Sequence, residues 1–422
     1  MLTFSQNFAT KDNKKAQKDT LFSQILKEKE NKASGYYDLP FQKRALQDSK
    51  EYLSTHEDIL KNLKNLVIIG VGGSSLGLKA VDSLLSHTKN RKNIALHFLE
   101  HTDSIATNVT LKKLKIKNTL FVTISKSGTT IETSSLMKYV LERFKILENK
   151  ESKKHLLVIT DKNSPLQQWA HKERIATVCI EKNVGGRFSV LSAIGILPLK
   201  ILGYDTKDLL KGAREFAESF FARKEDHLLQ KALFLTQNHK RYPINVLFSY
   251  ASIFKDFNAW YIQLWGESLG KIAQNGDSIG LTPVGLVGSI DQHSFLQLIV
   301  QGVQDKSVTF LALNPKLFTK PTIPNLKLEF LESTNFVNTM SFAQLLYKQQ
   351  QATMQTLQAQ NIPTDFIKLD SLNESSVGAL IMYYELLTSA VGCLFEINTY
   401  DQPGVEFGKK RLFDDITKKV KM

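Results

Sequence analysis

Cysteine is scarce in this chain. Only Cys179 and Cys393 occur among 422 residues, and they lie far apart in the sequence. Two such cysteines cannot form the disulfide framework that supports small secreted domains, so the sequence indicates a reducing compartment. Each cysteine has apolar neighbours, and we expect both to be buried free thiols.

The sequence also lacks a secretory signal and a clear transmembrane segment. Residues 1–19 become polar and charged within a few positions and contain no sustained apolar run. The longest apolar stretch, residues 375–395, is interrupted by Glu385 and by scattered Ser, Thr and Gly. A membrane span needs about 20 mostly apolar residues. We therefore expect a buried helix at this place, no membrane partner, and a cytoplasmic protein.

Acidic residues are fewer than basic ones. The chain has 55 Lys and Arg against 41 Asp and Glu, a formal net charge of +14. Such an excess occurs in nucleic-acid-binding proteins, but here the lysines are spread along the chain, and no zinc-finger, basic-zipper or aromatic RNA-binding motif accompanies them. A basic surface that attracts small anionic substrates explains the excess, so no nucleic-acid partner is expected.

Apolar runs typical of strands alternate with stretches of helical periodicity. The first set of runs is 65–70, 93–99, 119–124, 155–160 and 177–180, and the second is 244–250, 308–313 and 365–369. This alternation predicts βαβ units, because parallel neighbouring strands need crossover connections that are usually helical. We expect an α/β fold of two domains, each a mainly parallel sheet flanked by helices in three αβα layers.

The expected division of the chain has three parts. Residues 1–45 form an N-terminal helical arm, residues 46–200 form the first domain, and residues 201–422 form the second domain with the C-terminal helices. No internal repeat, low-complexity tract or Gly/Ser linker marks the boundaries.

Two of the predicted strands end in loops rich in glycine and hydroxyl groups. SKSGTT (125–130) follows one strand and GVGGSSLG (70–77) follows another. At the carboxyl end of a parallel strand, the next helix offers free N–H groups and a positive dipole end, which favour an anion. Taken alone, SKSGTT is better explained as a serine- and threonine-rich helix cap. The candidate phosphate ligands in the two loops are Gly73, Ser74, Ser125, Lys126, Ser127 and Thr130.

Other phosphate-binding loops have a different spacing. The dinucleotide motif requires Gly-x-Gly-x-x-Gly, and counting from Gly70 its third glycine position holds Ser75. The Walker pattern fails as well, because Gly-Lys-Ser/Thr is missing. Two hydroxyl-bearing turns suggest one small phosphate held from two sides.

Four further polar clusters lie in sequence that otherwise has the character of packed core. They are NVGGRFS (183–189), QLWGESLGK (263–271), DQHSFLQL (291–298) and YDQPGVEFGKK (400–410). Together with the two loops, and in the same order, they resemble the motifs of the glucose-6-phosphate isomerase (phosphoglucose isomerase) family. The similarity spans residues 70–409, and Asp401 to Lys409, which fits D-Q-x-G-V-E-x-x-K, is its most specific part.

The resemblance implies sugar-isomerase-type domains and an aldose–ketose isomerase of glycolysis and gluconeogenesis. Such an enzyme interconverts glucose 6-phosphate and fructose 6-phosphate by ring opening and a cis-enediol intermediate. Glu267 would be the base that moves a proton between C2 and C1. Arg187 would be the permanent cation facing the oxygens on which enediolate charge develops. An arbitrary glutamate is more often a residue on a solvated helix face, and for Glu267 the neighbouring Trp265 and glycines together with the resemblance reverse that preference.

The resemblance also assigns the ring-opening groups and a second subunit. His293 and Lys409 are the candidates for moving a proton between the C1 hydroxyl and the ring oxygen. In the family the histidine comes from the neighbouring subunit, so a homodimer with shared active sites is implied. Gln263 and Gln402 are expected to bind near the phosphate and the sugar, with structural amide caps as the alternative.

No metal and no cofactor are expected. The sequence has no clustered His, Cys and carboxylate spacing of a metal site, and proton transfer through an enediol can run on organic groups alone. Two other classes of protein remain as alternatives. A non-catalytic sugar-phosphate sensor would keep the phosphate loop and could lose Glu267, Arg187 and His293, and a nicotinamide-dependent dehydrogenase is disfavoured by the failed dinucleotide motif.

Overall fold

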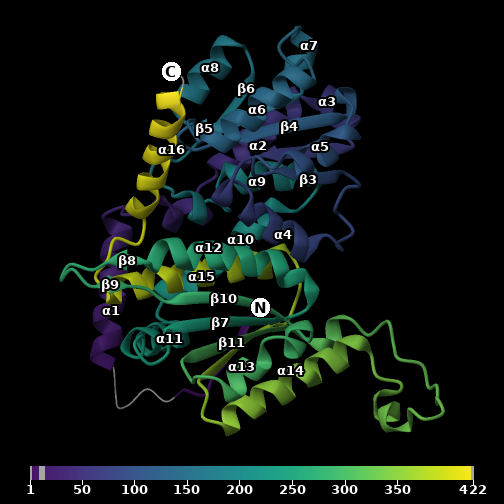
Figure 1. The fold of residues 1–422 in the computed structure, drawn as a ribbon, viewed down its shortest axis with the longest axis vertical. Helices are drawn as coiled ribbons and strands as arrows, with labels where there is room; N and C mark the ends of the chain where they lie inside the picture. Colours follow the sequence, from purple (N-terminus) through teal and green to yellow (C-terminus); the bar gives the residue numbers. More distant parts are fainter. Residues whose placement is uncertain (1, 9–14, 420–422) are drawn as a thin grey trace.

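The computed structural model describes residues 2–8 and 15–419, which form two five-stranded sheets with helices around and between them (Figure 1). The first sheet consists of β2 (Asn65–Ile69), β3 (Ala95–Leu99), β4 (Thr119–Ile124), β5 (Leu156–Asp161) and β6 (Ala176–Ile180). The second consists of β1 (Leu2–Gln6), β7 (Ile244–Tyr250), β10 (Thr282–Gly288), β11 (Lys306–Leu313) and β12 (Thr364–Leu369). The predicted α/β fold is confirmed.

The strand orders are those of crossover-connected sheets. The first sheet has the order β3-β2-β4-β5-β6 and is parallel throughout. The second has the order β1-β12-β11-β7-β10, in which only β1 is antiparallel to its neighbour. A separate hairpin pairs β8 (Lys271–Ile272) with β9 (Ser278–Ile279).

Helices cover both faces of both sheets. In the first half of the chain they are α1 (Lys15–Glu30), α2 (Arg44–Thr55), α3 (Glu57–Lys61), α4 (Leu76–Leu85), α5 (Ser104–Lys112), α6 (Ile131–Arg143), α7 (Lys150–Lys153), α8 (Pro165–Lys172) and α9 (Ala193–Leu202). In the second half they are α10 (Thr206–Phe221), α11 (Asp226–Gln237), α12 (Lys255–Leu269), α13 (Leu296–Gln301), α14 (Phe342–Ala359), α15 (Glu374–Leu394) and α16 (Glu406–Lys419). Figure 1 shows α10, α12 and α15 between the two sheets.

Successive residues of the central strands enter different cores. In β2, Leu66 and Ile68 belong to the large core that lies between the sheets, whereas Val67 and Ile69 belong to a second core formed with α5, α6 and α8. All four side chains are fully buried. Side chains alternate between the two faces of a strand, so a strand that is apolar at every position must be covered on both faces.

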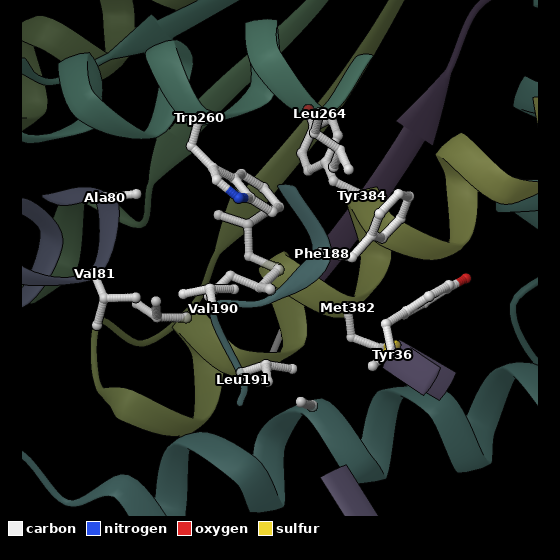
Figure 2. Packing of buried hydrophobic residues seen from close by; sticks show 14 of the residues in the cluster. Tyr36, Ala80, Val81, Phe188, Val190, Leu191, Trp260, Leu264, Met382 and Tyr384 are labelled. Atoms are coloured by element: carbon white, nitrogen blue, oxygen red, sulfur yellow. The ribbon is translucent and has the colours of Figure 1, made fainter. Parts of the chain in front are cut away.

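The large core joins the two domains. Figure 2 shows Trp260 and Leu264 of α12 packing in one cluster with Met382 and Tyr384 of α15 and with Val190, which precedes α9. The same cluster includes residues of both sheets. One continuous core therefore holds the loops of the first domain against α12.

Among the described residues, α15 is long and apolar enough to cross a membrane by length and composition. The relevant window of this helix is 89% buried inside the protein. The prediction of a buried helix at residues 375–395 is confirmed.

Two expectations are corrected. The amino-terminal segment begins with a strand, because Leu2 to Gln6 pair with β12, so a helical arm is wrong over these residues although α1 follows. The strand was missed because it has no continuous apolar run and its partner strand lies at the other end of the chain. Cys179 and Cys393 are free but only partly buried. The domain boundaries near residues 45 and 200 stay predictions.

Candidate active site

Two glycine turns meet at the carboxyl ends of the first sheet. The turn η2 (Gly72–Ser74) follows β2, and the turn η4 (Gly186–Phe188) follows β6. A Cβ atom placed on Gly73 would lie 2.1 Å from the carbonyl carbon of Gly186, so only glycine allows the turns to approach this closely. Gly72 has a φ of +60°, in the left-handed region that favours glycine.

The SKSGTT loop lies beside the first turn, because β4 is paired with β2. Within the loop, the hydroxyls of Ser125 and Thr130 are 3.1 Å apart, and the amide of Gly128 donates to the Ser125 hydroxyl at 3.2 Å. Gly128 has a φ of +73°. Thr130 is the N-cap of α6 but its side chain makes no capping bond. Its hydroxyl is therefore not committed to the helix end, which argues against a simple cap.

Lys126 is used inside the protein. Its ammonium donates to the backbone carbonyls of Lys182 (2.7 Å) and Val184 (2.8 Å). Burial lowers the pKa of Lys126, and the nearby Asp161 acts in the opposite direction. The side chain ties the phosphate-loop candidate to the segment that leads to Arg187.

The guanidinium of Arg187 lies at the centre of the site and is 2% exposed. Its Nε donates to the hydroxyl of Ser268 at 2.7 Å. Its Nη1 donates to Oε1 of Gln402 at 3.0 Å and lies 3.5 Å from Oε2 of Glu267. Burial lowers the pKa of Arg187, while the charge of Glu267 raises it.

Backbone carbonyls hold the other side of the guanidinium. Nη2 of Arg187 donates to the carbonyl oxygens of Thr399 (2.7 Å) and Asp401 (2.9 Å). A guanidinium has five N–H donors, and all five now have an acceptor. A planar fork bonded on every side has one orientation, so the cation is fixed before any substrate arrives.

Glu267 lies near the end of α12, one turn after Gln263. The side-chain amide of Gln263 donates to Oε1 of Glu267 at 3.2 Å, as expected for two residues four apart on a helix. The carboxylate side chain is 35% exposed, in contrast to the buried arginine. Oε1 of Gln263 is buried without a hydrogen-bond partner among the described residues. The site therefore offers a reachable carboxylate, a fixed cation and an unused acceptor.

His293 is not brought to this site within one chain. It ends the turn η6 (Ile290–His293), which follows the carboxyl end of β10, and its side chain is exposed. The Glu267 end of α12 lies at the other end of β10, where a Cβ on Gly266 would lie 3.8 Å from Pro283. A strand of this length spans about 20 Å. His293 and Glu267 of one chain thus lie at opposite ends of β10.

Lys409 also stands apart from the cluster around Arg187. It lies on α16, where its ammonium pairs with Glu406 at 2.7 Å and its side chain is 59% exposed. In Figure 1, α16 is the yellow helix that ends at the C-terminus, beside the first domain. In the described part of the chain, four of the candidate side chains lie together in one cluster, namely Arg187, Glu267, Gln263 and Gln402.

Several residues of the cluster had no predicted role. Ser268 and Lys271 lie inside the QLWGESLGK segment, and Asp401 lies inside the YDQPGVEFGKK segment, so their motifs were the available signal. Thr399 contributes only a carbonyl oxygen, which has no side-chain signature. Across residues 2–8 and 15–419, no group of three or more His, Cys, Asp or Glu side chains could hold a metal ion.

The arrangement is that of an α/β enzyme for a small anionic substrate, with anion-type loops beside a carboxylate and a cation. The phosphoglucose isomerase family model matches residues 51–422. The glucose-6-phosphate isomerase of Campylobacter jejuni is 46% identical over 376 residues, which cover 89% of this chain and 90% of that protein. The glucose-6-phosphate isomerase of Thermus thermophilus is 33% identical over 376 residues, which cover 89% of this chain and 88% of that protein. The chain belongs to the phosphoglucose isomerase family.

Solved structures agree on the fold. A hypothetical protein from Thermus thermophilus superposes with a TM-score of 0.86 at 30% identity, over 96% of this chain and 95% of that one. A glucose-6-phosphate isomerase from Chlamydia trachomatis superposes with a TM-score of 0.83 at 21% identity, over 100% of this chain and 89% of that one, which bears on the fold alone.

Proposed function

We propose that this protein reversibly isomerises glucose 6-phosphate and fructose 6-phosphate, in glycolysis and gluconeogenesis. The family match and the names of the most similar relatives support this activity. The observation that carries the proposal is the pairing of a reachable carboxylate, Glu267, with the buried and fully bonded guanidinium of Arg187. An aldose–ketose interconversion needs a base that both takes and returns a proton, and a cation for the charge that develops.

In the proposed mechanism Glu267 takes the proton from C2 of the open-chain aldose. The electrons of the C2–H bond form the C1=C2 double bond of the enediolate, and the C1 carbonyl electrons move onto its oxygen. Arg187 stabilises that negative charge, because its orientation is fixed beforehand. The hydroxyl proton of O2 then moves to O1, so the negative charge passes to O2. The protonated Glu267 gives its proton to C1 while the electrons on O2 form the C2 carbonyl of fructose 6-phosphate.

The substrate's phosphate would lie between the two loops of the first domain. Its proposed ligands are Gly73, Ser74, Ser125, Ser127 and Thr130. Lys126 would act by holding its loop, since its ammonium already has two carbonyl acceptors. Gln263, with its unused buried oxygen, and Gln402 would bind sugar hydroxyls.

A homodimer with shared active sites is part of the proposal. His293 would complete the site of the other subunit and, with Lys409, open the sugar ring. The separation of His293 from Glu267 along β10 supports this assignment. Ile290 and Leu298, which flank His293 in sequence, are 64% and 48% exposed, and a second copy would cover such apolar surface. We place the protein in the cytoplasm, since two free cysteines fit a reducing compartment.

A coupled assay tests the function. Purified protein is given fructose 6-phosphate, and glucose 6-phosphate is detected with a dehydrogenase and its nicotinamide in a second step. The proposal expects turnover with no metal or nicotinamide added in the first step. Binding of the sugar phosphate without any turnover would contradict it and would indicate a sensor.

A further inference from the structure

We propose that Lys271 and Tyr400 are positioning residues, which fix Arg187 for catalysis through the backbone of residues 399–402. This inference rests on the proposed isomerase function of the same site. The four-residue segment supplies three of the acceptors that hold the guanidinium, the carbonyls of Thr399 and Asp401 and the side-chain amide of Gln402. Any shift of the segment would therefore rotate or tilt the cation.

Lys271 holds this segment from the side of α12. Its ammonium donates to the backbone carbonyl of Asp401 and lies 3.0 Å from the Asp401 carboxylate. The lysine side chain is 7% exposed. The Asp401 carbonyl thus accepts hydrogen bonds from Lys271 and from Arg187 at once. Because Lys271 lies two residues after the end of α12, it links the helix that carries Glu267 to the carbonyl that orients Arg187.

Tyr400 holds the same segment through a second set of partners. Its hydroxyl donates to a carboxylate oxygen of Glu28 on α1 and lies 3.0 Å from the hydroxyl of Ser389 and 3.1 Å from that of Tyr37. Its ring lies 5.5 Å from the ring of Phe188, the residue after Arg187. Three partners on two helices and a turn make the position of this hydroxyl well defined.

The neutral form of Tyr400 is the one that donates to Glu28. Burial raises the pKa of Tyr400 well above its usual value, and the negative charge of Glu28 acts in the same direction. The hydroxyl therefore stays protonated over the range in which the enzyme is assayed. Through this bond the N-terminal helix α1 takes part in orienting Arg187, although it contacts no reacting group.

The distinction between positioning and simple stabilisation can be measured. The phosphate loops bind the charged end of the substrate, and Gln402 of the held segment binds only a sugar hydroxyl, whereas turnover depends on where Arg187 points. Loss of Lys271 is therefore expected to lower kcat by a larger factor than it raises KM. A residue needed only for stability would lower the melting temperature and leave kcat of the folded fraction unchanged.

Four variants test the inference in the coupled assay. Lys271→Met keeps the length of the buried stem and removes the charge, and we expect kcat to fall about tenfold to a hundredfold, the scale typical of groups that orient a functional side chain. Lys271→Arg should recover most of that loss, since it keeps a donor cation. Tyr400→Phe should lower kcat about threefold to tenfold, which is the loss in rate that corresponds to the free energy of one hydrogen bond. The control is Lys145→Met, which removes an exposed lysine that forms an ion pair with Glu148.

The outcomes separate this inference from the function on which it rests. A wild-type protein without isomerase activity would overturn both. An active wild type together with a Lys271→Met variant of normal kcat would overturn the inference alone. Should Lys271→Met fail to fold, Tyr400→Phe decides, because it removes a single oxygen atom, and a normal kcat in that variant would refute the positioning role of the segment.

Discussion

Arg187 shows why a permanent planar cation suits this position better than a lysine. Each edge of its guanidinium has a different acceptor, from a hydroxyl to two carbonyls. An ammonium has three donors and no plane, so it could not keep five bonds or one orientation. We predict that Arg187→Lys lowers kcat about a hundredfold to a thousandfold with a small change in KM, as for loss of a preorganised donor. Steady-state kinetics in the coupled assay measure this, and a kcat near that of the wild type would remove the electrostatic role.

Glu385 is a residue of a different kind, a carboxyl group enclosed in the middle of α15. It is fully buried, and neither carboxyl oxygen has a hydrogen-bond partner among the described residues. Burial raises its pKa well above the ordinary value of 4.5. The folded protein therefore keeps this proton at pH values at which the unfolded chain has lost it. The contribution of this protonation to the free energy of unfolding is fully present below the ordinary pKa. It falls by about 1.4 kcal/mol per pH unit as the pH rises towards the raised pKa.

The variant Glu385→Gln removes this dependence. We predict that its gain in melting temperature over the wild type is larger at about pH 8 than at about pH 5, since only the wild type must keep a carboxyl group protonated. Glu148→Gln, at an exposed ion pair, is the control. An equal effect of Glu385→Gln at both pH values, measured by calorimetry, would show that Glu385 is not a source of pH-dependent stability.

At the scale of elements, the site depends on the contact between the turns η2 and η4. A methyl group on Gly73 would overlap the backbone of Gly186 and would push the glycine turn away from Arg187. We predict that Gly73→Ala lowers kcat/KM by about a hundredfold or more, because a small displacement of positioned groups has effects of that size. The melting temperature should also fall. Gly408→Ala, with nothing within 4 Å of the added atom, is the control for melting temperature. Normal kinetics in Gly73→Ala would mean that the turns need not touch.

Strands with a continuous apolar run were predictable from the sequence, and strands without one were not. The runs 119–124 and 244–250 have the bounds of β4 and β7. β10 was missed because Pro283, Gly285 and Gly288 interrupt its apolar pattern. β1 was missed because its partner β12 lies at the other end of the chain, and no local pattern reveals such a pairing.

The site was predictable to the extent that side chains with a distinctive motif form it. Arg187 and Glu267 were identified from their motifs, and the structure puts them in one cluster. The carbonyls of Thr399 and Asp401 were not identified, because a backbone acceptor is available at every residue and only the folded chain selects which ones are used. Lys271 was overlooked for a related reason, since its partner lies 130 positions away.

At the scale of the whole molecule, the separation of His293 from Glu267 predicts complementation. A subunit with His293→Ala keeps a normal Glu267, and a subunit with Glu267→Gln keeps a normal His293. In a mixed dimer one of the two sites is intact, so random mixing of two inactive variants should give roughly a quarter of wild-type activity. Co-expression with two affinity tags isolates the mixed dimer and avoids reliance on subunit exchange. An inactive purified mixed dimer would contradict shared active sites.

Proton transfer by the carboxylate of Glu267 is tested most directly by solvent exchange. In D2O, nuclear magnetic resonance follows the appearance of deuterium at C2 of glucose 6-phosphate and C1 of fructose 6-phosphate. The wild type is expected to show exchange and interconversion, and Glu267→Gln is expected to lose both while calorimetry still detects sugar-phosphate binding. Undiminished exchange in Glu267→Gln would mean that another group moves the proton and that Glu267 is not the base.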